Sequence, residues 1–156
     1  MHATLLAQQF ELNHQVAHAN LADITHEESL VHPSPAGNCL NWVLGHVVAT
    51  RNVVMDTLGE PRIWNADLAS PYQRGARPPL AATCATPLGD ILAALDASQQ
   101  TIVGRLATMT EKDLARSVND QGTVGDWLAR LSFHESYHLG QCGLLRRLLG
   151  KDGAIA

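Results

Sequence analysis

Four stretches of the chain repeat apolar residues at steps of three and four, the spacing that places side chains on one face of an α-helix. They are predicted to form helices over about 4–30, 38–58, 87–109 and 123–149. Ala and Leu dominate the apolar residues, and Phe, Trp and Tyr make up only 4% of the chain, which favours helices over strands. The pattern predicts an all-α fold, a four-helix bundle, and the length of 156 residues fits one domain over 1–156.

The segment 59–86 interrupts this pattern, because it holds four of the seven prolines and no sustained helical period. Connections of this length usually carry a function or link distant elements. We predict a long crossover between the second and third helices. Trp64, Tyr72, Arg74 and Arg77 would let this crossover also cover one end of a pocket.

Residues typical of helix ends mark several boundaries. Asn38 and Thr86 are predicted N-caps of the second and third helices. Thr123 and Asp126 have the spacing of a shortened capping box at the start of the fourth helix, and Gly150 follows its end.

Charge and cysteine content narrow the classes of partner and the compartment. Eleven Lys and Arg stand against fifteen Asp and Glu, a net charge of −4, so a nucleic-acid partner is not expected. No apolar stretch reaches the ~18 residues of a membrane span, and the N-terminus lacks the pattern of a secretory signal. Cys39, Cys84 and Cys142 are widely spaced and odd in number, which fits reduced thiols and a cytoplasmic location.

Polar residues interrupt the apolar stripe of the fourth helix. His134 and His138 are four residues apart, so one divalent metal ion can bind both imidazoles. Burying them without partners would cost about 1–3 kcal/mol each. The stripe is predicted to face the core as a whole; its members are Trp127, Leu131, His134, His138, Gln141, Leu145 and Leu148.

His46 extends this pattern to a second helix. It lies in the middle of an otherwise apolar helix, on a stripe with Trp42 and Val53. Three inward imidazoles on two helices predict a site for Zn²⁺ or a similar ion, with a fourth position open to water or a substrate thiolate. The alternative is that each histidine is a hydrogen-bonded core residue.

Gln141 and three glycines lie close to these histidines in the sequence. Gln141 is predicted either to orient a metal ligand or bound water, or to make an ordinary core hydrogen bond. Gly45, Gly140 and Gly143 cost stability inside helices, so they either allow close approach of another segment or a ligand, or are simply tolerated.

Three sequence strings carry a resemblance to a known family. The chain resembles the DinB-like superfamily of metalloenzymes through Asn41-Trp42-x-x-Gly45-His46, His134-Glu-Ser-Tyr-His138-Leu-Gly-Gln141 and Arg146-Arg147-Leu-Leu-Gly150. The resemblance implies a bundle with a long crossover, often a homodimer, and a zinc or nickel ion on His46, His134 and His138. It also implies that Asn20, Trp42, Tyr137 and Gln141 support the ligands or contact substrate.

The resemblance implies several activities. Relatives include transferases and isomerases that use low-molecular-weight thiols such as mycothiol, bacillithiol or glutathione. A thiol S-transferase acting on a small molecule is therefore the leading hypothesis, with no catalytic residue assigned. A metal-dependent hydrolase and a metal-binding protein without turnover are the alternatives.

The string from His134 to His138 also satisfies the HExxH pattern of zinc proteases, in which the glutamate is the general base. That site needs a third ligand further along the chain, and the 18 residues after His138 contain no His or Glu. Glu135 lies about 100° around the helix from His134. It is therefore predicted to be solvated or at an interface.

Two further features have metal-ligand chemistry. His14 and His18 are four residues apart, but they share a half-polar stripe and are predicted to be mostly exposed. Cys142, four residues beyond His138, is either a fourth ligand or reactive thiol, or a small buried hydrophobic residue.

Overall fold

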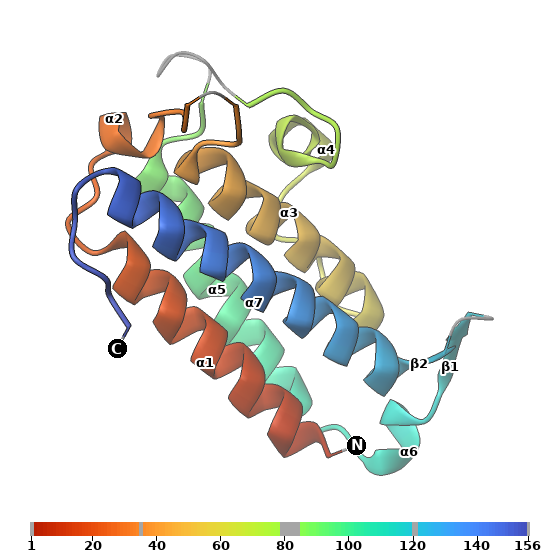
Figure 1. The fold of residues 1–156 in the computed structure, drawn as a ribbon. Helices are drawn as coiled ribbons and strands as arrows, with labels where there is room; N and C mark the ends of the chain where they lie inside the picture. The colour runs from red at the N-terminus through yellow and green to blue at the C-terminus, as the bar shows by residue number, and fades with distance from the viewer. Residues whose placement is uncertain (1, 35, 79–84, 120–121, 156) are drawn as a thin grey trace.

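Four long helices lie side by side in this computed structural model, which describes residues 2–34, 36–78, 85–119 and 122–155 (Figure 1). Cys84 lies outside the described residues. The long helices are α1 (Ala3–Leu21), α3 (Leu40–Leu58), α5 (Leu88–Leu106) and α7 (Val124–Leu148). None of the described helices is both long enough and apolar enough to cross a membrane.

Each long helix packs against two others, which makes a four-helix bundle as predicted. Both α1 and α3 contact α5 and α7. In Figure 1, α1 and α7 run in one direction, and α3 and α5 run in the other. Because α3 and α5 are parallel neighbours, the chain must return along the length of the bundle between them, as the crossover prediction requires.

The connections contain short elements of their own. The crossover holds α4 (Ala66–Ala69) and the 3₁₀ turn η1 (Ser70–Tyr72), so it is not entirely without structure. The other short elements are α2 (His26–Ser29), α6 (Glu111–Leu114) and an antiparallel pair of strands, β1 (Ser117–Asn119) and β2 (Gly122–Thr123).

The first predicted helix is wrong in length. It ends at Leu21, and Asp23 adopts a left-handed backbone conformation with φ 60°. Thr25 then begins α2 with a capping box, in which its hydroxyl accepts from the Glu28 N–H and the Glu28 carboxylate accepts from the Thr25 N–H. The apolar period continues across this break, which is why the sequence pattern missed it.

Other helix ends agree with the sequence more closely. The capping box of Thr123 and Asp126 at the start of α7 is confirmed. The second and third long helices begin with Cys39 and Pro87 as N-caps, each one residue after the predicted cap.

The apolar core is divided in two by a polar layer. One apolar cluster contains Leu44, Leu95 and Leu139, and the other contains Phe10, Val54 and Leu128. Between them, all four helices bury polar side chains at the same height: Asn13, Arg51, Asn52, Ser98, Gln99, Ser132 and Glu135.

A buried ion pair lies at the centre of this layer. The Arg51 guanidinium donates to both Glu135 oxygens, with Nη2–Oε1 2.7 Å and Nε–Oε2 3.0 Å. Its other N–H groups donate to the Leu95 carbonyl, the Ser98 hydroxyl and the Gln99 amide oxygen on α5. The prediction that Glu135 is solvated or at an interface is therefore wrong.

We expect Glu135→Ala to lower the free energy of unfolding by about 3–5 kcal/mol, because it leaves the Arg51 charge buried without its partner. Urea unfolding followed by circular dichroism measures this change. The matched control is Asp56→Ala, which removes the carboxylate of an exposed ion pair with Arg62 and should leave stability nearly unchanged. Equal losses in the two variants would contradict this account of the buried pair.

Candidate metal centre

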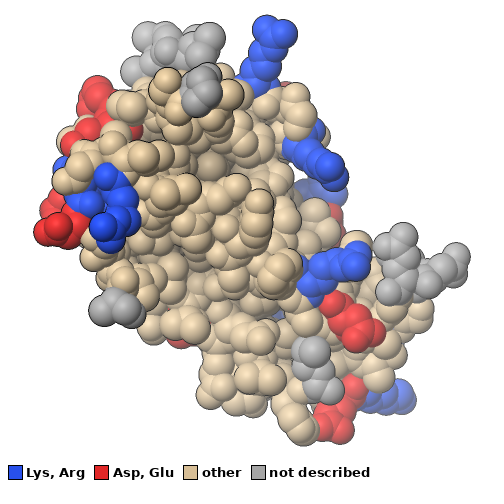
Figure 2. All heavy atoms as spheres, in the orientation of Figure 1, with Lys and Arg blue, Asp and Glu red and all other residues tan. Residues whose placement is uncertain are grey.

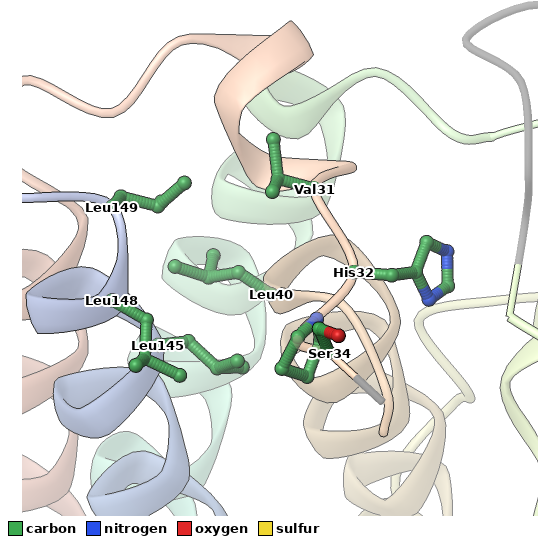
Figure 3. Close-up of a pocket in the computed structure, with 8 residues that line it drawn as sticks. Val31, His32, Ser34, Leu40, Leu145, Leu148 and Leu149 are labelled. Carbon is green, nitrogen blue, oxygen red and sulfur yellow. The ribbon is translucent and has the colours of Figure 1, made fainter. Parts of the chain in front are cut away.

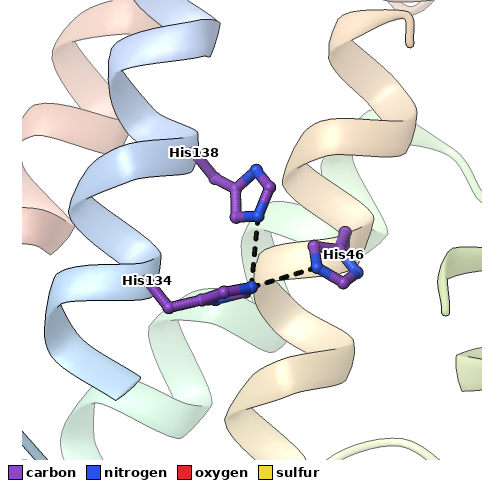
Figure 4. Close-up of side chains that lie close together, drawn as sticks. All are labelled: His46, His134 and His138. Atoms are coloured by element: carbon purple, nitrogen blue, oxygen red, sulfur yellow. Dashed lines mark hydrogen bonds between the residues drawn. The ribbon is translucent and has the colours of Figure 1, made fainter. Parts of the chain in front are cut away.

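Three histidines converge between α3 and α7 (Figure 4). His134 Nε2 lies 3.2 Å from His46 Nε2 and 3.1 Å from His138 Nε2. One ring comes from α3, and the other two lie one turn apart on α7. The structure thus brings the three predicted histidines together as a group that could hold a metal ion.

The spacing of the nitrogen atoms suits a small cation. Nitrogen ligands about 2.0–2.1 Å from a tetrahedral Zn²⁺ ion lie roughly 3.3 Å from one another. The two observed nitrogen separations of 3.1 and 3.2 Å are close to that value.

The Nδ1 atoms of His46 and His138, which point away from the group, already have hydrogen-bond partners. His46 Nδ1 is 2.7 Å from the Tyr72 carbonyl oxygen, and His138 Nδ1 is 2.7 Å from Gln141 Oε1. Both oxygens only accept, so each Nδ1 donates and the neutral ring keeps a lone pair on Nε2. A single proton on His134 Nε2 can satisfy only one of these lone pairs well, whereas a cation accepts a lone pair from all three rings. The donor set therefore fits a metal ion.

Burial keeps the rings of His134 and His138 in the form that binds metals. The pKa of His134 is lowered to about 4, first by burial and then by the nearby His138 and His46. Burial also lowers the pKa of His138, although its hydrogen bond to Gln141 acts in the opposite direction. His134 Nδ1 is buried without a hydrogen-bond partner among the described residues. Neutral imidazole is the ligating form.

The crossover packs directly against this part of α3. The Trp42 ring stacks on His46, with centroids 5.0 Å apart and an interplanar angle of 6°, and its Nε1 donates to the Pro71 carbonyl. The Tyr72 ring lies so close to Gly45 that an added Cβ would overlap with it. Gly45 therefore allows the close approach that the sequence suggested.

A sequence comparison identifies the family. The family model of the DinB superfamily matches residues 9–142. The chain belongs to the DinB superfamily. No curated protein matches it.

One solved structure is similar to this DinB-superfamily chain. It is described as a conserved protein from Enterococcus faecalis, with 18% sequence identity and a TM-score of 0.77 over 97% of this chain and 99% of that one. At this identity the likeness shows the fold alone.

The residues predicted to support the site have different positions in this DinB-superfamily chain. Gln141 contacts His138 as described, and the Tyr137 ring meets His138 edge-on, with centroids 5.3 Å apart. Asn20 instead donates to the Leu139 carbonyl, and so joins α1 to the backbone of α7 beside the histidines.

The prediction that the whole α7 stripe faces the core is wrong in its rotation. Leu131 and Leu145 are buried, but His134 and His138 are only partly buried and Leu148 is exposed. The fully buried face includes Leu128, Glu135, Leu139 and Cys142. Each of these residues directly follows a member of the predicted stripe, so the helix is rotated by about one residue from the predicted orientation. The histidines consequently lie at the edge of the core, where their side chains are partly exposed.

Several other candidates lie away from the histidine group. The Glu135 carboxylate is occupied by Arg51, which argues against its use as the base of an HExxH protease. Cys142 is fully buried and burial raises its pKa to about 12, which agrees with a small hydrophobic residue. Arg74 and Arg77 are exposed on the crossover.

A separate pocket of about 270 Å³ lies between the end of α7 and the segment before α3 (Figure 3). Most of its side chains are apolar, and none of the three histidines lines it. The lining residues are Val31, His32, Pro33, Ser34, Leu40, Leu145, Leu148 and Leu149.

Gly45→Ala is expected to destabilise the protein by about 1–3 kcal/mol, because the added methyl group would displace the Tyr72 ring. The same displacement would move the carbonyl that holds His46. Urea unfolding tests this expectation.

Gly140→Ala is the matched control, since a Cβ there meets no atom within 4 Å. It should keep or raise stability, by up to about 1 kcal/mol. A similar loss of stability in both variants would show that the contact with Tyr72 is not the cause.

Proposed function

We propose that this protein binds a divalent ion, zinc or nickel, on His46, His134 and His138, and uses it to transfer a low-molecular-weight thiol to a small electrophilic molecule. The observation that carries the proposal is the convergence of three Nε2 atoms, in a group in which the rings of His46 and His138 are held from outside by hydrogen bonds to Nδ1. Membership of the DinB superfamily supports it, because the strings that the chain shares with that family include all three histidines.

His46, His134 and His138 would hold the divalent ion as neutral imidazoles, and the ion would supply a Lewis acid that favours the thiolate form of a thiol. The reaction class forms one bond from sulfur to the electrophile and releases a leaving group, with loss of the thiol proton. The Tyr72 carbonyl and Gln141 orient two of the rings. Trp42 packs on one side of His46, and the exposed Tyr137 ring forms an outer wall beside His138.

We expect His138→Ala to reduce the bound metal by one equivalent, because it removes one of three ligands. Elemental analysis after dialysis against Zn²⁺ and then metal-free buffer measures the content. His2→Ala is the control, since this histidine is 78% exposed and lies outside the group. Unchanged metal content in His138→Ala would contradict the proposed ligand set.

The pH dependence of Zn²⁺ binding provides a second test of the same site. Protons compete for a ligand only as the pH falls through its pKa in the folded protein. Because the pKa values of His134 and His138 are lowered, protons should compete for these two rings only at a lower pH than for an ordinary imidazole, and for His134 toward about pH 4. A steep loss already near pH 7 would contradict this environment for the two rings.

Activity distinguishes three functions. We expect the metal-loaded protein to consume mycothiol, bacillithiol or glutathione in the presence of monobromobimane or chlorodinitrobenzene, and His138→Ala to fall to the background rate. Ester or amide hydrolysis without thiol consumption would instead support a metal-dependent hydrolase. Bound metal with no turnover in any assay would support a binding protein.

We also propose that the protein forms a homodimer through the outer face of α7. Four large apolar side chains on this helix, Phe133, Tyr137, Leu144 and Leu148, are each at least 59% exposed. In the orientation that places α1 and α7 in front, the middle of the surface carries few charged side chains (Figure 2). Exposed apolar patches of this kind mark interaction sites.

Phe133→Asp combined with Leu144→Asp should convert the dimer to a monomer, because it places charges in the apolar interface. Analytical ultracentrifugation measures the mass, and circular dichroism checks that the helices remain. Leu68→Asp, on α4 and also exposed, is the control and should leave the dimer intact. A monomeric wild-type protein would contradict the proposal.

We further propose that the chain is cytoplasmic and forms a single domain over 1–156. The two described cysteines, Cys39 and Cys142, are free and buried, as suits a reducing compartment. Both apolar clusters draw on all four long helices, which supports one folding unit.

A further inference from the structure

A second group of ligand-type side chains lies between α1 and α5. His14 and His18 stand one turn apart on α1, and their Nε2 atoms are 2.7 and 2.6 Å from the same oxygen, Asp96 Oδ1. The three possible ligand atoms lie within 4.8 Å of one another. This group shares no residue with the histidines of α3 and α7.

The sequence prediction that His14 and His18 are mostly exposed is wrong for His14, whose side chain is only 21% exposed. The side chains of His18 and Asp96 are both 44% exposed. The α5 helix covers part of the half-polar face of α1 and brings a carboxylate to it, across a sequence separation of 82 residues from His14.

Two imidazoles and one carboxylate are a ligand set that zinc and related divalent ions use, with water in the remaining position. Ligand atoms around a tetrahedral ion lie roughly 3.3 Å apart, so each imidazole would separate from Asp96 Oδ1 by somewhat more than half an ångström. The partial exposure of His18 and Asp96 leaves these side chains room to move that far.

The surroundings favour a cation. The cavity over this group is also lined by Glu11, Gln99, Gln100, Val103 and Gly104. Its lining therefore includes two carboxylates, those of Glu11 and Asp96, and no Lys or Arg. Glu11 is itself held in place by hydrogen bonds from Gln15 and Gln99.

We propose that His14, His18 and Asp96 form a second binding site for a divalent transition metal ion, which joins α1 to α5. The ion takes two nitrogens from one helix and one oxygen from the other, so it binds fully only when the helices are packed together. Such an ion stabilises the folded state over the unfolded state.

Isothermal titration calorimetry, in which Zn²⁺ is added to the chelator-treated protein, tests this site. The wild type should bind two equivalents of Zn²⁺ per chain, and Asp96→Asn should bind one. The His138→Ala variant should also bind one equivalent, and adding Asp96→Asn to it should abolish that binding. His14→Asn should weaken the second site at least ~10-fold, since even the loss of an outer partner of a ligand costs that much. Zn²⁺ should also raise the Tm of His138→Ala but not that of the double variant.

Glu111→Gln is the matched control, because it removes the carboxylate of an exposed pair with His2 that has only one imidazole. It should leave both equivalents in place. The proposal is overturned if Asp96→Asn leaves the number of bound ions unchanged, or if Glu111→Gln reduces it equally. Should the first site fail to bind, the wild type would bind one ion and Asp96→Asn none, so the two sites are tested separately.

Discussion

The Arg51–Glu135 pair constrains how three of the four long helices pack together. A buried charge is tolerated only when its partner and hydrogen bonds are all in place, and Arg51 obtains them from Glu135 on α7 and from three groups on α5. Glu135 must therefore face inward. Because neighbouring helix positions are about 100° apart, this rotation places His134 and His138 at the edge of the core, next to α3.

The crossover completes the histidine group from outside the bundle. Since α3 and α5 run parallel, the connecting chain passes back along the helices, and its 3₁₀ turn brings the Tyr72 carbonyl to His46. The Tyr72 hydroxyl donates to Asn41 on α3 and accepts from the Thr86 N–H. One tyrosine thus links the crossover to α3 at two points, and the lack of a side chain at Gly45 makes room for its ring.

The two ligand groups lie on different helix pairs and differ in chemistry. The group on α3 and α7 offers three imidazoles, with burial lowering the pKa of two of them, which suits an ion that acts on a bound substrate. The group on α1 and α5 combines two imidazoles with a carboxylate in a more open setting. That arrangement suits an ion that joins helices.

The sequence alone determined that the chain forms four long helices, the capping box of Thr123 and Asp126, and the choice of His46, His134 and His138 as candidate ligands. These depend on local spacing and on the chemistry of single side chains, both of which can be read from neighbouring residues. The tertiary structure decided the Arg51–Glu135 pair, the approach of Asp96 to His14, and the Tyr72 carbonyl behind His46. The first two join residues more than 80 positions apart, and the third depends on the path of the crossover. Which face of α7 points inward also depended on packing, because apolar residues on several faces leave the helix rotation open until its neighbours are present.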